Sequence, residues 1–176
     1  MTLYVLHTHW VIDAPLQAVW EVAYDIERWP SWWRYVDAVI RLEPGERTGV
    51  GAVYRCIWTT RLPYTLTFDI RATRVRPYRL IEGAASGEIE GISRCIFRNL
   101  EFGTSIHHEW RVRTTKPWMN RLAAPLKPVF IWNHHAVMKA GGDSLAKRLG
   151  ATLLRFETRE PSMDFQSQAE TRSGSR

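Results

Sequence analysis

Between residues 36 and 115 the chain consists almost entirely of segments with the composition of β-strands, separated by very short gaps. The segments rich in apolar, aromatic and β-branched residues span 36–43, 51–61, 64–76, 79–86, 90–100 and 104–115. Short Gly- or Pro-containing pairs such as Pro44-Gly45 and Leu62-Pro63 separate them. Because a parallel connection needs a dozen or more residues, these gaps predict hairpins and one antiparallel sheet. Residues 3–12 have similar composition and add a seventh strand.

Alternation along these strands predicts which side chains face an apolar interior. The inward set is Tyr54, Cys56, Trp58, Leu66, Phe68, Ile70, Ala72, Ile106, His108, Trp110 and Val112. Residues 92–98 do not alternate cleanly, so the facing of Arg94 and Arg98 stays open. Facing inward, a guanidinium would bind a ligand carboxylate or an enolate. Facing outward, it would belong to a solvated strand surface.

The segment after the first strand predicts two short helical pieces. Apolar residues recur at three- and four-residue spacing up to Tyr24, with Asp13 expected as the N-cap. Pro30 then stops one helix, and a second turn carries Trp32 and Trp33. We expect Trp29 in the core and Trp32 as a gate at a cavity mouth.

Beyond Pro117 the apolar spacing becomes helical and predicts one long helix with a main segment over roughly 128–149. Pro125 and Pro128 are expected to kink it or to separate a short lead-in, and Gly141-Gly142 to add a soft point. The sequence after Leu154 is polar. We therefore expect one α+β domain over residues 1–154 and a disordered polar tail over 155–176.

The distribution of charged and apolar residues restricts the kinds of partner that we expect for this protein. The net charge is +6, yet the last 26 residues hold four basic and four acidic side chains, so the excess lies in the first 150 residues. There the arginines are mostly spaced singly along strands, which indicates a solvated face and no nucleic-acid partner. No signal peptide and no run of about 20 apolar residues is recognisable, so we expect a cytoplasmic protein without a membrane span. The oligomeric state stays open.

Several short motifs, in order along the chain, resemble those of the START-like SRPBCC superfamily, and within it the polyketide cyclase/dehydrase and lipid-transport group. They are Ala14-Pro15, Val19-Trp20, Asp25, Trp29-Pro30-Ser31-Trp32, Gly49-Val50-Gly51, Thr114-Thr115-Lys116-Pro117-Trp118 and Trp132-Asn133-His134. The resemblance implies a helix-grip fold, in which a curved seven-stranded antiparallel sheet wraps round the long C-terminal helix. It also implies a deep cavity between them for a hydrophobic small molecule. It carries over no catalytic residue.

Large aromatic side chains on the inward face predict the walls of such a cavity, although each of them could instead fill a core. The candidate ligand-binding residues are Trp32, Tyr54, Trp58, Phe68, His108, Trp110, Phe130 and His134. Either histidine could act as a general acid or base, or could be a hydrogen-bonded core residue.

The sequence gives little support for a metal site or for a nucleophilic cysteine. Adjacent residues such as His107 and His108 point to opposite faces of a strand and cannot chelate one ion. Cys56 and Cys95 have no neighbouring activating group and are interpreted as small buried hydrophobes. We expect no metal and no cofactor.

Three functions remain open. The first is binding of an aromatic, polyketide-like or lipid molecule, as a carrier or sensor. The second is a polyketide cyclase or dehydratase that uses a cavity His or Arg as acid/base or enolate stabiliser. The third is an interaction module that uses the basic face and the tail.

Overall fold

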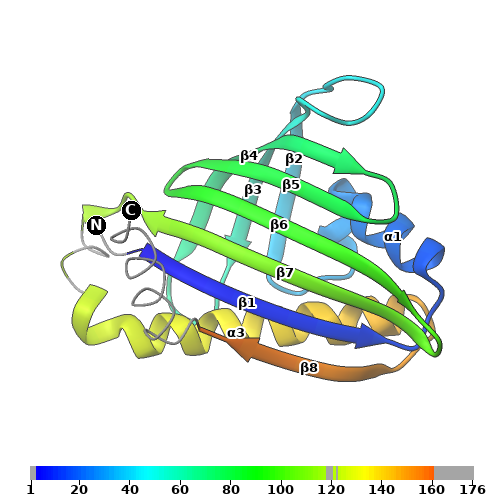
Figure 1. Cartoon of the computed structure of the whole chain (residues 1–176). Helices are drawn as coiled ribbons and strands as arrows, with labels where there is room; N and C mark the ends of the chain where they lie inside the picture. Colours follow the sequence, from blue (N-terminus) through cyan, green and yellow to red (C-terminus); the bar gives the residue numbers. More distant parts are fainter. Residues whose placement is uncertain (1–2, 118–120, 122, 161–176) are drawn as a thin grey trace, which may run out of the picture.

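The computed structural model describes residues 3–117, 121 and 123–160, and its main feature is one antiparallel sheet that curves over a long helix (Figure 1). The strands, in chain order, are β1 (Leu3–Ile12), β2 (Val36–Glu43), β3 (Val53–Thr59), β4 (Thr65–Arg76), β5 (Leu80–Gly87), β6 (Ile89–Leu100), β7 (Gly103–Thr114) and β8 (Leu153–Arg159). The strand order across the sheet is β2-β3-β4-β5-β6-β7-β1-β8. The hairpins predicted from the short Gly and Pro gaps are therefore confirmed.

Over the described residues the sheet has eight strands, so the expectation of seven was wrong by one. The additional strand, β8, pairs with β1 from His7↔Arg159 to Ile12↔Leu153. Residues 155–159 therefore belong to the sheet and not to the expected tail. Exposed charged residues occupy part of this edge strand, which is why it resembles a solvated tail in sequence. The rest of the expected tail, residues 161–176, lies outside the described residues.

Two short helices follow β1. Helix α1 spans Leu16–Tyr24, and a 3-10 helix, η1, spans Ile26–Ser31. Pro15 is the N-cap residue of α1 and makes no side-chain capping bond, so the expectation of Asp13 as N-cap was wrong. Pro is tolerated here because the N–H groups at the start of a helix have no intrahelical acceptor, so its missing N–H removes no helical hydrogen bond.

Helix α3 (Ala123–Arg148) lies along the concave side of the sheet and is continuous through Pro128 (Figure 1). Pro128 is the sixth residue of the helix and lacks the N–H that would bond the carbonyl four residues earlier, yet the helix continues past it, so the expected break does not occur. Trp118, quoted above among the family motifs, lies outside the described residues.

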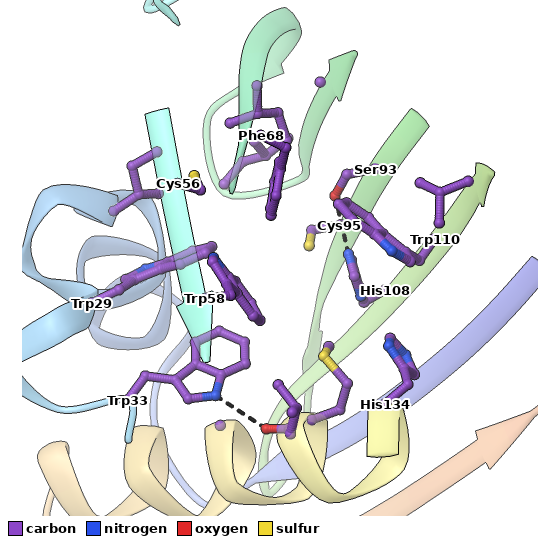
Figure 2. Close-up of a pocket in the computed structure, with 18 of the residues that line it drawn as sticks. Trp29, Trp33, Cys56, Trp58, Phe68, Ser93, Cys95, His108, Trp110 and His134 are labelled. Atoms are coloured by element: carbon purple, nitrogen blue, oxygen red, sulfur yellow. Dashed lines mark hydrogen bonds between the residues drawn. The ribbon is translucent and has the colours of Figure 1, made fainter. Parts of the chain in front are cut away.

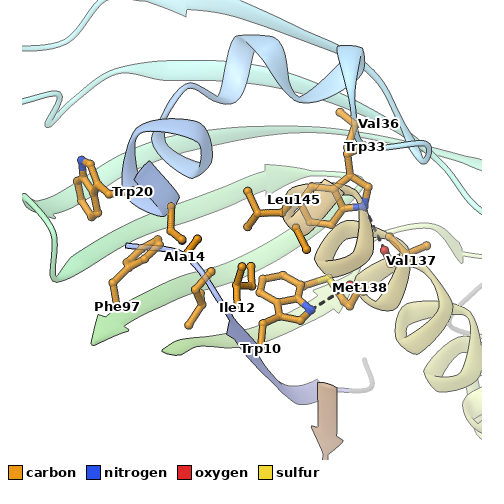
Figure 3. Packing of buried hydrophobic residues seen from close by; sticks show 13 residues of the cluster. Trp10, Ile12, Ala14, Trp20, Trp33, Val36, Phe97, Val137, Met138 and Leu145 are labelled. Atoms are coloured by element: carbon orange, nitrogen blue, oxygen red, sulfur yellow. Dashed lines mark hydrogen bonds between the residues drawn. The ribbon is translucent and has the colours of Figure 1, made fainter. Parts of the chain in front are cut away.

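The main core lies between β1, α1, η1 and the C-terminal half of α3 (Figure 3). Trp10 and Trp33 approach the helix from two sides, and each indole N–H donates to a carbonyl of α3, that of Met138 at 3.2 Å and that of Val137 at 3.1 Å. These bonds satisfy the polar atoms of two buried rings. Several residues of this core, Trp33 and Met138 among them, also line the cavity described next.

Candidate functional site

A cavity of about 260 Å³ lies between the concave side of the sheet, η1 and α3 (Figure 2). All eight candidate ligand-binding residues line it. Tyr54 and Trp58 come from β3, Phe68 from β4, His108 and Trp110 from β7, Phe130 and His134 from α3, and Trp32 directly follows η1. For the five candidates that lie on strands, two-residue alternation therefore correctly predicted the side of the sheet that faces the cavity.

Strand β6 contributes lining residues that the sequence did not reveal. Ser93, Cys95 and Phe97 face the cavity, whereas Arg94 and Arg98 point away from it. Arg94 pairs with Glu82 at 2.7 Å on the outer face. Apolar residues at outward positions, such as the 47% exposed Ile92, had obscured the alternation. The inward-facing arginine that would bind an anionic ligand is therefore absent from this strand, all of which the structure describes.

Tryptophans form one wall of the cavity. Trp33 is buried, and its ring centre lies 5.0 Å from that of Trp58 and 5.2 Å from that of Trp29. Trp29 is half-buried, donates its N–H to the carbonyl of Ala23 and packs against the main core. Trp32 is half-buried and stacks on Trp33. Its role as a gate stays a prediction.

Two histidines supply the polar part of the lining. His108 is 8% exposed, and its Nε2 lies 3.0 Å from the hydroxyl oxygen of Ser93. His134, on α3, lies beside it in Figure 2. His108 Nδ1 and His134 Nε2 are buried and have no hydrogen-bond partner among the residues that the structure describes.

Burial keeps these imidazoles uncharged. It lowers the pKa of His108 from 6.5 to about 4, and that of His134 to about 3. The proximity of the other histidines adds to both pKa shifts, because two neighbouring positive charges repel. Both side chains are therefore neutral at pH 7, and each can donate or accept a hydrogen bond according to its tautomer.

The two cysteines offer no reactive thiol. Burial raises the pKa of both Cys56 and Cys95 to about 12, so neither forms a thiolate at neutral pH. Within the described ranges no group of three His, Cys, Asp or Glu side chains is arranged to hold a metal ion.

The outward face of the sheet carries the excess arginines of the sequence. Several of them pair with carboxylates on neighbouring strands, as Arg55 does with Asp69 and Arg113 with Glu90. Such exposed pairs each contribute about 0–1 kcal/mol to stability. The basic strand residues thus form a solvated outer surface, as the sequence indicated.

An antiparallel sheet closed over a long C-terminal helix, with an internal cavity between them, defines the helix-grip class of ligand-binding folds. A family model described as polyketide cyclase / dehydrase and lipid transport matches residues 6–150. The chain belongs to this family. No curated protein matches the sequence.

Solved structures share the fold at low sequence identity. A START superfamily protein from Mycobacterium smegmatis aligns with a TM-score of 0.68 and 12% identity, over 84% of this chain and 97% of its own. The Zhui aromatase/cyclase from Streptomyces sp. R1128 aligns with a TM-score of 0.65 and 14% identity, over 85% and 94%. The protein TTHA0849 from Thermus thermophilus aligns with a TM-score of 0.66 and 14% identity, over 82% and 98%. None of the described helices is both long and apolar enough to cross a membrane.

Proposed function

We propose that this protein binds a hydrophobic small molecule, aromatic, polyketide-like or lipid, in the cavity between the sheet and α3, as a carrier or sensor. The observation that carries the proposal is the cavity itself, which is internal and is lined mostly by aromatic and aliphatic side chains. Protein interiors ordinarily pack without voids of this size, and apolar walls of this kind are typical of small-molecule sites. Membership of a family whose description includes lipid transport agrees with it.

The first experiment is native mass spectrometry of the purified protein, which detects a small molecule retained in the cavity. The second blocks the cavity with Cys95→Phe, because Cys95 lines it and a larger ring occupies the ligand's volume. Ile96→Phe is the matched control, since Ile96 neighbours it on β6 and is not among the lining residues. We expect ligand retention to fall at least tenfold in Cys95→Phe alone. Equal retention in both variants, with both folded, would contradict the proposal.

Catalysis is the second candidate function, and the paired Ser93 and His108 inside the cavity favour it. In an aldol-type ring closure, a neutral imidazole takes the proton from a carbon between two carbonyls, and the resulting enolate attacks a further carbonyl carbon of the same substrate. The oxygen of that carbonyl becomes an alkoxide and takes the proton back from the imidazolium. Loss of water then needs a protonated group to deliver a proton to the leaving hydroxyl. With its pKa at about 4, His108 is a weak base and is almost never protonated at pH 7. This low basicity of His108 favours binding over catalysis.

A further inference from the structure

Two buried polar atoms without a partner among the described residues lie beside each other at one end of the cavity (Figure 2). They are His108 Nδ1 and His134 Nε2. The hydroxyl of Thr8 is also buried and unpartnered among the described residues, but Thr8 is not one of the lining residues. Thr8 is fully buried and stands directly opposite His108 in the register of β1 and β7. A buried polar atom without a partner costs about 1–3 kcal/mol. Two such atoms beside each other on the cavity wall indicate that this end of the cavity is built to receive a polar group.

The group that fits is uncharged. Among the described residues that line the cavity there is no lysine or arginine. Glu82 borders the cavity, but its carboxylate pairs with Arg94 on the outer face. Both histidines are neutral at pH 7, so nothing on the described part of the cavity wall compensates a negative charge. Burying an unpaired carboxylate costs far more than burying a hydroxyl or carbonyl that finds a hydrogen bond.

We propose that the ligand is an uncharged molecule with a hydroxyl or carbonyl oxygen at one end, and that this oxygen binds His108 and His134. The assignment rests on the proposed function and narrows it, because it selects neutral phenols, alcohols and ketones over fatty acids and other carboxylates. Ser93 occupies one nitrogen of His108 and leaves the other for the ligand. A neutral imidazole donates to a carbonyl or accepts from a hydroxyl, so the site suits both groups.

Three probes of similar size test this: naphthalene, naphthol and naphthoate, each titrated at pH 7 against the tryptophan fluorescence of the full-length protein. The affinity for naphthalene measures the contribution of the apolar cavity walls alone, and naphthol differs from it by one hydroxyl group. One additional hydrogen bond predicts that naphthol binds about fivefold to tenfold more tightly than naphthalene. Naphthoate, which is a carboxylate at this pH, is expected to bind more weakly than either.

Substitutions of the two histidines test whether they cause the preference for naphthol over naphthalene. His108→Phe keeps an aromatic ring and should make the affinities for naphthol and naphthalene equal. His107→Phe is the matched control, because His107 directly precedes His108 on the same strand and faces the opposite side of the sheet. It should keep the naphthol preference. His134→Phe gives an independent second test if His108→Phe does not fold.

The outcomes separate the two proposals. Equal binding of naphthol and naphthalene by the natural protein, or tightest binding of naphthoate, overturns the neutral-ligand assignment and leaves hydrophobic binding in place. A naphthol preference that survives both His108→Phe and His134→Phe also overturns it. Failure of all three probes to bind removes both proposals.

Discussion

At the scale of single residues, Gly141 and Gly142 determine how closely α3 lies to its neighbours. A Cβ atom at Gly141 would lie 2.3 Å from the indole ring of Trp33, and one at Gly142 would lie 2.6 Å from that of Trp10. The sequence suggested a soft point in the helix here. In the structure the helix is continuous, and the two glycines form a notch that admits both tryptophans. Small residues in a helix permit such close approach because they have no side chain to displace.

Gly141→Ala is expected to destabilise the protein by up to about 2 kcal/mol. The added methyl group overlaps a buried ring, and this cost outweighs the gain of about 1 kcal/mol in helix propensity. Urea unfolding measures the change in the free energy of unfolding. Lys147→Ala, at an exposed position of the same helix, should be nearly neutral. If Gly141→Ala were as stable as the natural protein, close packing against Trp33 would not be what retains the glycine.

At the scale of elements, β8 shows what sequence patterns miss. It covers the edge of β1, and its Leu153 and Phe156 pack against the main core. A strand at the edge of a sheet keeps polar residues toward solvent, so its composition approaches that of a loop. The seven other described strands follow from their composition and the short gaps between them, and the terminal helix from its apolar periodicity. Alternation also predicted the inward face of β3, β4 and β7, but not that of β6.

Phe156→Ala tests whether β8 is an integral part of the sheet. The ring is half-buried against the core, so we expect a loss of about 1–2 kcal/mol in the free energy of unfolding. Arg155→Ala, one residue earlier and exposed, should change it by less than about 0.5 kcal/mol. Thermal or urea unfolding compares them. Equal effects of the two substitutions would mean that β8 adds no packing energy.

At the scale of the whole molecule, the site exists only where the sheet and α3 meet. His108 and His134 are 26 positions apart in the sequence and come from different elements, yet they form one polar, neutral end of the cavity. Alternation predicted that His108 faces inward, and helical spacing placed His134 near Phe130. Neither pattern shows that His108 Nδ1 and His134 Nε2 have no hydrogen-bond partner among the described residues. That depends on where all the neighbouring side chains lie.

Acid should destabilise the protein through these histidines. The pKa of His108 is about 4 in the folded protein against 6.5 for an ordinary imidazole, so the unfolded chain binds the proton more readily. This contribution is complete above about pH 6.5 and is lost as the pH falls toward 4. For His108 alone the loss is on the order of 3 kcal/mol. Urea unfolding at a series of pH values should show a shallower decline in His108→Phe than in the natural protein. Parallel curves would contradict a buried neutral imidazole.

The sequence by itself determined the antiparallel meander, the long terminal helix, the family and the inward-facing side chains of the strands that alternate cleanly. These follow from local rules, since two-residue alternation, helical spacing and short Gly or Pro gaps are properties of neighbouring residues. Only the tertiary structure decided that β8 joins the sheet, that Arg94 and Arg98 face outward and that Gly141 receives a tryptophan. It also decided that the cavity has an uncharged polar end. Each of these depends on contacts between residues far apart in the chain, where burial and the presence or absence of a partner set the free energy.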